Sequence, residues 1–430
     1  NNFFNWNYKI VDAVNSNTNC IPKDFGHGSF VCVCNSTYCD TLPPLQNPGK
    51  GKVLTVTSSK EEKRWQIDVL KLRSKKKHKC FSDIDVAIKL DESKTYQKIL
   101  GFGGAFTDAT GINLRLLPQE LQDISIKGYY GLDGLEYNVG RVPIAGTDFS
   151  DYPYTYDDLP PGQIDSDLKY FALRKEDYKY KYRFLEKYES EGISFWGMTI
   201  QNEPTAGLFF DYAFNEMAWM PQEQGLFIGE YLGPQLEKAG KEHIKIFILD
   251  DQRLFLPTWA IKLLEQRNSS KYVNGIAVHW YRDSISPVKL LDLTHDYFPG
   301  LPVLYTEACV GTQPWDLVHV LPGSWVRGEQ YAKDIIENLQ HWVVGWTDWN
   351  LALDLEGGPN WVQNFADSPL LVNPLEVYRQ PMFYALAHFS KVFPEGSKRI
   401  GSTSSGRNES IYYVAFLRPD GTKAITIMNK

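Results

Sequence analysis

The chain has 430 residues, of which 43% are hydrophobic and 23% are charged, and its formal net charge is −7. A chain of this length can bury large cores and form two or three domains. The acidic balance argues against nucleic acid as a partner, because polyanions bind to basic surfaces. No stretch of about 18 apolar residues occurs, so we expect no transmembrane helix. The chain begins at Asn1 without Met or an apolar leader, which is typical of a processed or partial chain.

Cysteines and sequons near the N-terminus indicate an oxidising compartment. Four cysteines fall within twenty residues, at Cys20, Cys32, Cys34 and Cys39. They allow three pairings, and their spacing differs from the CxxC units of zinc sites, so it favours two disulfides. Asn-X-Ser/Thr sequons occur at Asn35, Asn268 and Asn408. Together these features predict passage through the secretory pathway.

Both ends of the chain are predicted to form β-structure. Alternating and β-branched residues predict strands over Val53–Thr57, Trp65–Leu72 and Ile84–Leu90. Ser410–Leu417 and Ala424–Met428 flank a Pro-Asp-Gly turn signal near the C-terminus. We therefore expect the two ends to meet in one accessory sandwich-like domain that brackets the middle of the chain.

The middle of the chain alternates short apolar strands with helical patterns. The predicted strands are Ile99–Gly103, Tyr137–Ile144, Phe195–Ile200, Ile244–Leu249, Gly275–His279, Pro302–Thr306 and Val343–Asn350. The predicted helices include Leu226–Ala239, Trp259–Arg267 and Gln330–His341. Such alternation predicts an α/β fold with a parallel sheet, and eight units would close a TIM barrel. Only seven strands are found, because no apolar strand occurs between Ile144 and Phe195.

Two glutamates follow predicted strands of this barrel. Glu203 follows Phe195–Ile200, and Glu307 follows Pro302–Thr306. Catalytic groups of TIM barrels lie at the carboxyl ends of strands, and burying a charge there without a partner is costly. If one strand is missing before Glu203, the two residues end strands 4 and 7. Paired carboxylates about 5–5.5 Å apart are the working groups of a retaining glycoside hydrolase.

Other polar and aromatic residues also stand at strand ends. We expect Arg141 to orient the nucleophile, Tyr281 to lie beside it and Asn202 to donate to a sugar 2-hydroxyl. Trp349 is a candidate sugar platform. Asp148 and His279 also follow predicted strands. No His, Cys and Asp grouping has metal-ligand spacing, so neither a metal nor another cofactor is expected.

Several longer motifs in the chain resemble one enzyme family over nearly its whole length. They are Cys20–Lys23, Val31–Asn35, Gly101–Ala105, Asn202–Pro204, Leu249–Arg253, Gly275–Tyr281, Glu307–Gly311, Gly345–Leu353 and Gly357–Val362. The family is that of the animal lysosomal glucosylceramidases, which are retaining glycoside hydrolases of family 30. The resemblance implies a catalytic barrel, a sandwich domain and a small antiparallel sheet.

The resemblance also implies roles for individual residues. Glu203 matches the acid/base and Glu307 the nucleophile. The residues that match the lining of the glucose site are Arg141, Asp148, Asn202, Tyr212, Phe214, His279, Tyr281, Trp349 and Asn364. The implied disulfides are Cys20–Cys32 and Cys34–Cys39. The implied substrate is glucosylceramide, and the implied partners are an anionic lipid surface and a saposin-type activator, met by a peripheral protein of the lysosomal lumen.

The resemblance further suggests three sets of domain boundaries. Residues 1–45 and 351–381 would form the small disulfide-bearing sheet. Residues 46–95 and 397–430 would form a sandwich that lacks its C-terminal strands. Residues 96–350 and 382–396 would form the barrel.

One departure from the family leaves alternatives open. The family's Ser-Pro-Trp-Thr-Ser-Pro segment, which ends its third barrel strand, has no counterpart between Lys179 and Leu185. A barrel short of one strand has two unpaired edges. The chain could therefore be an inactive splice or gene-model variant of the family. A third interpretation is another retaining β-glycosidase, of xylosidase or galactosidase type.

Overall fold

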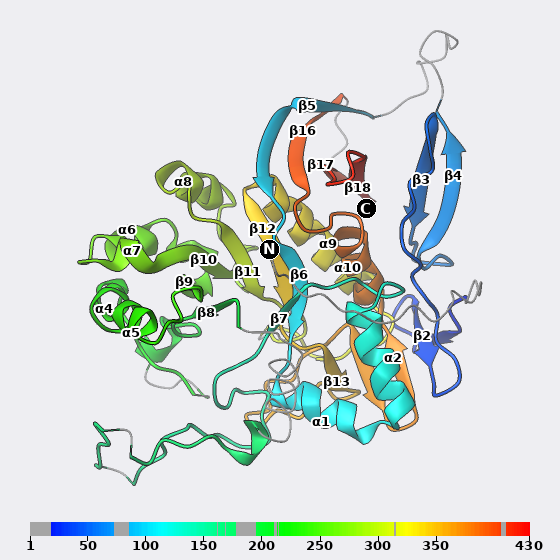
Figure 1. The fold of residues 1–430 in the computed structure, drawn as a ribbon. Helices are drawn as coiled ribbons and strands as arrows, with labels where there is room; N and C mark the ends of the chain where they lie inside the picture. Colours follow the sequence, from blue (N-terminus) through cyan, green and yellow to red (C-terminus); the bar gives the residue numbers. More distant parts are fainter. Residues whose placement is uncertain are drawn as a thin grey trace.

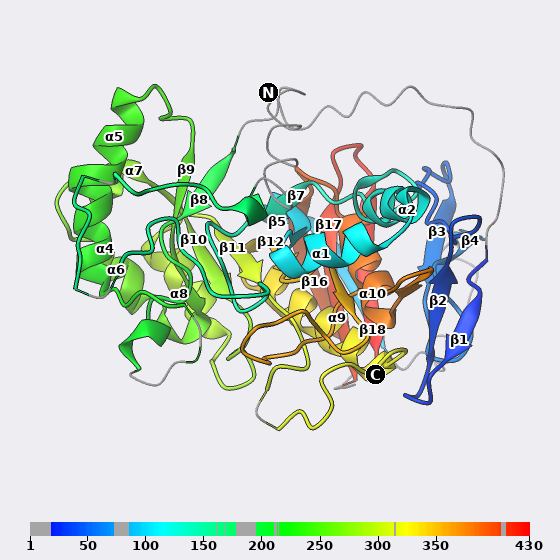
Figure 2. The ribbon, with the colours of Figure 1, turned by 90° about the horizontal axis from the view of Figure 1, so that it is seen from below.

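The fold is described from a computed structural model. The described residues are 19–72, 86–160, 162–167, 169–177, 195–209, 213, 215–313, 315–405 and 410–430. The central feature is a curled parallel sheet, with helices on its outer side and three smaller sheets toward one end of the molecule (Figures 1 and 2).

The central sheet contains seven parallel strands in the order β7-β6-β12-β11-β10-β9-β8. They are β6 (Gly101–Ala105), β7 (Val139–Arg141), β8 (Gly197–Thr199), β9 (Lys245–Gln252), β10 (Val273–His279), β11 (Val303–Glu307) and β12 (Val343–Asp348). The first strand, β6, pairs with the last, β12, as in a closed barrel. The prediction of a TIM-barrel sheet with seven strands is confirmed.

The sheet is open at the place where the sequence lacks a strand. Among the described residues, β7 and β8 are the two edges, and they are not paired with each other. Between these two edge strands, the connection over residues 145–160, 162–167 and 169–177 extends away from the barrel (Figure 1). The predicted helix over Tyr178–Ser190 lies outside the described residues.

The burial of the central strands on both faces explains why their sequences are continuous apolar runs. Every residue of β11 and β12 is buried, as expected for parallel strands covered on both faces. The glycines of β6 permit close approach to its neighbours. A Cβ atom at Gly103 would lie 2.1 Å from the carbonyl oxygen of Val139 on β7. The glycine run therefore serves strand packing.

Helices cover the outer side of the sheet. Their bounds are α1 (Asp108–Leu116), α2 (Gln119–Tyr130), η3 (Ala206–Leu208), α4 (Pro221–Phe227), η4 (Ile228–Leu232), α5 (Gly233–Lys238), η5 (Arg253–Phe255), α6 (Thr258–Leu264), α7 (Ser269–Tyr272), α8 (Lys289–Tyr297), α9 (Trp325–Gln340) and α10 (Pro381–Ser390). The helix predicted over Leu226–Ala239 is part of the run α4-η4-α5. Helices α4 to α8 lie beside β8–β11, and α9 and α10 lie beside β12 and β6 (Figure 1).

The two ends of the chain meet in smaller sheets. A five-stranded sheet contains β1 (Pro22–Asp24), β2 (Phe30–Cys34), β15 (Glu376–Arg379), β14 (Leu370–Asn373) and β13 (Ala352–Asp354). A four-stranded sheet contains β18 (Lys423–Asn429), β17 (Ile411–Leu417), β16 (Lys398–Ser405) and β5 (Ala87–Lys98). The hairpin of β3 (Lys52–Thr57) and β4 (Gln66–Lys71) forms a sheet of its own. The exact domain boundaries stay a prediction.

One expectation for the small sheet needs correction. β13 and β14 pair in parallel, whereas the other strand pairs of this sheet are antiparallel. The long connection over residues 355–369 allows this, because parallel neighbours need a crossover and antiparallel ones need only a turn.

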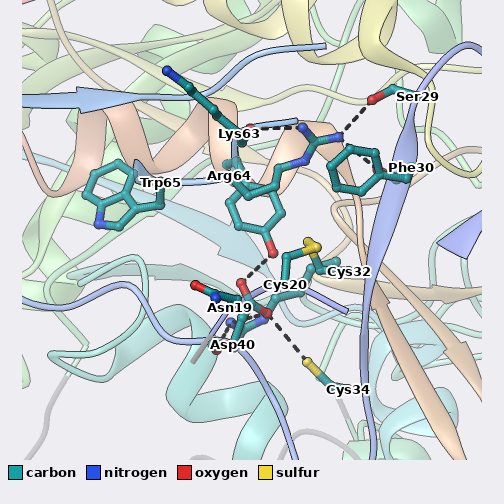
Figure 3. Close-up of a disulfide and its surroundings, with 12 residues drawn as sticks. Asn19, Cys20, Ser29, Phe30, Cys32, Cys34, Asp40, Lys63, Arg64 and Trp65 are labelled. Carbon is teal, nitrogen blue, oxygen red and sulfur yellow. Dashed lines mark hydrogen bonds and ion pairs between the residues drawn. A yellow bond between two sulfur atoms is a disulfide. The ribbon is translucent and has the colours of Figure 1, made fainter. Parts of the chain in front are cut away.

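Two disulfides hold the N-terminal part of the small sheet. They join Cys20 to Cys32 and Cys34 to Cys39, the pairing that the resemblance implies. Beside them, Arg64 donates to the Phe30 carbonyl at 2.9 Å and lies over the Phe30 ring (Figure 3). This contact ties Arg64, two residues before β4, to β2, so the hairpin is attached to the disulfide-bearing sheet.

A buried arginine links the barrel to its outer layer. Arg253 of η5 is 1% exposed and donates to the carbonyls of Asp283 and Ser286 at 2.8 and 2.7 Å. It also donates to Asn338 of α9 at 3.0 Å and pairs with the Asp283 carboxylate at 3.1 Å. A cation held by this many partners cannot be removed without leaving buried acceptors unpaired.

Arg253→Met is therefore expected to lower the free energy of unfolding by about 3–5 kcal/mol, because it leaves Asp283 buried without its cation. The matched control is Arg267→Met. Arg267 is exposed, and its single ion pair, with Glu230 at 3.6 Å, is open to solvent and therefore weak. The control should change stability by no more than about 0.5 kcal/mol. Urea unfolding followed by tryptophan fluorescence measures both, and equal midpoints for the two variants would contradict the prediction.

Candidate active site

Irregularities at the ends of three neighbouring strands shape the site. Between β9 and β10 the pairing skips Asp250, which has a positive φ of 55°. Between β10 and β11 the pairing skips Thr306. Bulges of this kind re-aim side chains, and strained backbone collects at functional sites. Here the Thr306 hydroxyl donates to Asp250 Oδ1 at 2.7 Å, so the two irregularities support each other.

Arg141 at the end of β7 is the centre of the site. Its guanidinium donates to Glu307 Oε2, to Asp250 Oδ2 at 3.0 Å and to Asn202 Oδ1 at 2.8 Å. Burial by itself raises the pKa of Asp250, but the charge of Arg141 and hydrogen bonds from His279 and Thr199 outweigh burial and hold it well below its usual range. Asp250 is therefore an anion that helps to retain the arginine.

His279 connects the two predicted catalytic carboxylates. Its Nδ1 lies 2.8 Å from Glu203 Oε1, and its Nε2 lies 3.1 Å from Asp250 Oδ1 and 3.9 Å from Glu307 Oε2. Burial lowers the pKa of His279, but the charge of Glu307 and the hydrogen bonds with Asp250 and Glu203 raise it well above its usual range. The ring is 0% exposed. This burial favours a role in positioning Glu203 over direct contact with a sugar.

Glu203 follows β8 in a backbone conformation with a φ of 41°. Its amide donates to the Asp250 carbonyl at 2.8 Å, which ties its turn to the bulge of β9. Its Oε1 also accepts from Gln252 Nε2 at 2.8 Å. The carboxylate is thus fixed by a histidine and an amide from two neighbouring strands, while its side chain keeps 12% exposure toward the mouth.

Glu307 at the end of β11 accepts from Arg141 and from the Tyr281 hydroxyl, the latter at 2.8 Å. Burial raises the pKa of Glu307 above its usual range, and the charges of His279 and Arg141 oppose that rise without cancelling it. The two cations and the hydroxyl each stabilise the ionised form, as a nucleophilic carboxylate requires.

Asp148 marks another part of the same site. Its Oδ2 accepts from Asn364 Nδ2 at 3.0 Å and from Asn360 Nδ2 at 3.3 Å. Burial raises the pKa of Asp148 to about 7 despite these hydrogen bonds. Trp349 after β12 is 5% exposed and lies under the Arg141 guanidinium, 5.1 Å from ring centre to Cζ.

The site residues predicted from the sequence are mostly brought together. Arg141, Asn202, Glu203, His279, Tyr281, Glu307 and Trp349 form one contact network, and Asp148 with Asn364 lies beside it. Tyr212 and Phe214 lie outside the described residues. Of the predicted glycan acceptors, Asn268 is exposed at the start of α7, Asn35 is half-buried, and Asn408 lies outside the described part of the chain.

Sequence reasoning assigned no role to Asp250 or Gln252. The signal was present, because both follow the apolar run of β9 as Glu203 and Glu307 follow theirs. Glu216 was also missed. It follows no strand, and only the structure reveals it, because burial and repulsion from Glu203, Glu307, Asp251 and Asp148 raise its pKa to about 9.

The separation of the carboxylates decides which chemistry the arrangement can support. An oxygen of Glu203, a ring nitrogen of His279 and an oxygen of Glu307 lie within 4.8 Å of one another. Such atoms can also bind a metal, but the neighbouring Arg141 cation disfavours one. An upper limit of 4.8 Å between the two carboxylate oxygens fits the ~5–5.5 Å arrangement of retaining glycosidases better than the ~6.5–9.5 Å of inverting ones.

Comparison with known families agrees with this geometry. Residues 99–183 and 179–393 match the glycosyl hydrolase family 30 TIM-barrel domain, and residues 396–430 match the family 30 β-sandwich domain. The chain belongs to glycoside hydrolase family 30. The two barrel matches meet at residues 179–183, where the sequence lacks the third strand.

Relatives of this family 30 chain match it almost from end to end. The mouse lysosomal acid glucosylceramidase is 39% identical, with 96% of this chain and 89% of the relative covered. The putative glucosylceramidase 4 of Caenorhabditis elegans is 37% identical, with 95% and 88% covered. The crystal structure of SrfJ from Salmonella typhimurium shares the fold, with a TM-score of 0.73 at 21% identity and 86% and 90% covered.

The pKa of Asp148 predicts a pH dependence of stability. It is about 7 in the folded chain and close to 4 in an unfolded one, so the folded chain binds more protons between these values. Stability from this group is therefore fully present below about pH 4 and is lost as the pH rises to about 7. Melting temperatures of the wild type should fall relative to Asp148→Asn across this range. Parallel curves for the two proteins would contradict the assignment.

Proposed function

We propose that this glycoside hydrolase cleaves the β-glucosidic bond of glucosylceramide with retention and releases glucose and ceramide. The observation that carries the proposal is the short separation of Glu203 and Glu307, with each carboxylate held by different donors. The names of the mouse and nematode relatives support the choice of substrate.

The reaction would proceed in two steps. Glu307 attacks the anomeric carbon, the bond to the ceramide oxygen breaks, and protonated Glu203 gives that oxygen its proton. In the second step Glu203 takes a proton from water, and the resulting hydroxide displaces Glu307 and releases glucose. Arg141 and Tyr281 would hold Glu307 for attack, and His279 with Gln252 would hold Glu203.

The remaining residues would bind the sugar. Asn202 accepts from Arg141 through Oδ1, which assigns its amide nitrogen as the donor to the 2-hydroxyl. Asp148, held by Asn364, would accept from other glucose hydroxyls. Tyr212, Phe214 and Trp349 would supply aromatic walls against the C–H faces of the sugar.

Covalent trapping tests the proposal. Incubation with a β-glucose-configured epoxide or fluoro-sugar should add one label, and peptide mapping should place it on Glu307. Glu307→Gln should take no label, and the mouse relative serves as the positive control. If the mouse relative is labelled and this chain is not, the alternative of an inactive family member whose barrel does not close is favoured.

The sugar specificity needs its own comparison. Faster turnover of synthetic β-xylosides or β-galactosides than of β-glucosides would favour the alternative of a different retaining β-glycosidase.

A membrane surface would deliver the lipid substrate. Phe209 after β8 is 68% exposed, and Trp315 and Leu317 after β11 are 68% and 95% exposed. These loops lie at the carboxyl ends of parallel strands, on the edge where the site opens. None of the helices in the described residues is long and apolar enough to cross a bilayer. We infer peripheral docking in the lysosomal lumen, on an anionic lipid surface and with a saposin-type activator.

Replacement of the exposed apolar loop tests this docking. Trp315→Ser combined with Leu317→Ser should weaken binding to vesicles of anionic phospholipid at acidic pH by about 10-fold, because apolar surface leaves the membrane. Turnover of a water-soluble glucoside should be retained. Leu375→Ser, at an exposed turn of the small sheet, is the matched control. Equal binding by both variants in a sedimentation assay would exclude these loops as the docking surface.

A further inference from the structure

Asp251 of β9 is hydrogen-bonded to the short turn that carries the predicted acid/base. Its Oδ2 accepts from the backbone amide of Thr205 at 3.0 Å and from the Thr205 hydroxyl at 2.7 Å. Thr205 stands two residues after Glu203, and both belong to one turn, because the Ala206 amide donates to the Glu203 carbonyl at 2.9 Å. One carboxylate oxygen therefore holds this acid/base turn, Glu203–Ala206, by two bonds.

The other oxygen of Asp251 supports the Glu203 carboxylate through a second residue. Asp251 Oδ1 accepts from the backbone amide of Gln252 at 2.7 Å. The Gln252 side chain in turn donates to Glu203 Oε1 at 2.8 Å. Asp251 thus joins the backbone that follows Glu203 to the residue that holds the Glu203 carboxylate.

The acid/base turn needs such support, because its backbone is strained. Glu203 has a φ of 41°, in the left-handed region that residues with a side chain rarely adopt. A conformation of this kind persists only where the surrounding structure imposes it. Backbone bonds supply part of the support, from the Glu203 amide to the Asp250 carbonyl and from the Trp219 amide to the Pro204 carbonyl. The bonds to Asp251 add support from a side chain.

Burial makes Asp251 a costly residue for a purely structural task. It is 1% exposed. The cations of the site, Arg141 and His279, form ion pairs with other carboxylates, and no described residue forms one with Asp251. Burial, followed by repulsion from Glu203, raises the pKa of Asp251 to about 6, although its three hydrogen bonds oppose the rise. A neutral side chain would be buried at lower cost, so the carboxylate is explained by the two groups that it joins.

We propose that Asp251 is a positioning residue for the acid/base, which fixes the Glu203 carboxyl group where it reaches the oxygen of the leaving group. The inference rests on the proposed function, in which Glu203 gives that oxygen its proton, and deepens it. General acid catalysis contributes about 10²–10⁴-fold and requires the acid within hydrogen-bond reach. A loosened turn therefore slows cleavage most where the leaving group depends on a proton.

Two glucosides that differ in the leaving group test the inference. Phenyl β-glucoside needs a proton on the leaving oxygen, whereas 2,4-dinitrophenyl β-glucoside releases a stable anion without one. We expect Asp251→Ala to lower kcat/KM about 100-fold for the phenyl glucoside and less than about 3-fold for the dinitrophenyl glucoside. Thr205→Val removes one of the two bonds to the turn and should lower the ratio of the two values about 10-fold.

Two further variants serve as controls. Thr205→Ser keeps the hydroxyl group and should retain the wild-type ratio of the two kcat/KM values. Thr294→Val removes a hydroxyl that donates to the Leu290 carbonyl in and before α8, and it should also retain this ratio. Active-protein concentrations from labelling with the β-glucose epoxide correct each value for partial unfolding.

The outcomes separate this inference from the proposed function. An equal loss with both substrates, or no loss with either, overturns the role of Asp251. If Asp251→Ala does not fold, the comparison of Thr205→Val with Thr205→Ser decides. If the wild type cleaves neither glucoside, the proposed function fails, and amide hydrogen exchange over Glu203–Ala206 decides the inference. Faster exchange in Thr205→Val than in Thr205→Ser supports it, whereas equal exchange overturns it.

Discussion

The contacts of the Arg141 guanidinium hold the catalytic end of the sheet together. From β7 it reaches Glu307 on β11, Asp250 on β9 and Asn202 after β8. A largely buried cation is stable only when anions and acceptors surround it, and those groups are stable only while the cation is present. The position of the nucleophile, the bulge at Asp250 and the turn of Glu203 therefore depend on one another.

The same contacts explain how a site can exist in a sheet that is not closed. β7 and β8 are the unpaired edges, and no backbone ladder joins them in the described part of the chain. The bond between Arg141 on one edge and Asn202 beyond the other crosses this opening at 2.8 Å. Side chains thus perform part of the work that a third strand performs in a complete barrel. On the opposite side, the pairing of β6 with β12 keeps the remaining strands in barrel order.

Charge is distributed unevenly around this centre. The anions next to Arg141 and His279 are compensated, and they hold the nucleophile and the acid/base in place. No cation is paired with Asp148 or Glu216 among the described residues, and burial raises the pKa of each. The inner groups therefore suit a fixed catalytic role. The raised pKa values of Asp148 and Glu216 suit hydrogen bonding to neutral hydroxyl groups that a ligand supplies.

The sequence by itself determined the strands of the barrel, the position of the missing strand and the two predicted catalytic glutamates. These features depend on local patterns, because a buried parallel strand reads as an apolar run and a charge at its end stands out. The same rule applied to β9 would have found Asp250, whereas Glu216 follows no strand and carries no such signal. The partners of Asp250, the central place of Arg141 and the bonds that tie Asp251 to the turn of Glu203 were decided only by the tertiary structure. The physical reason is that hydrogen bonds and charge repulsion depend on distances of a few ångströms between segments that are far apart in the chain.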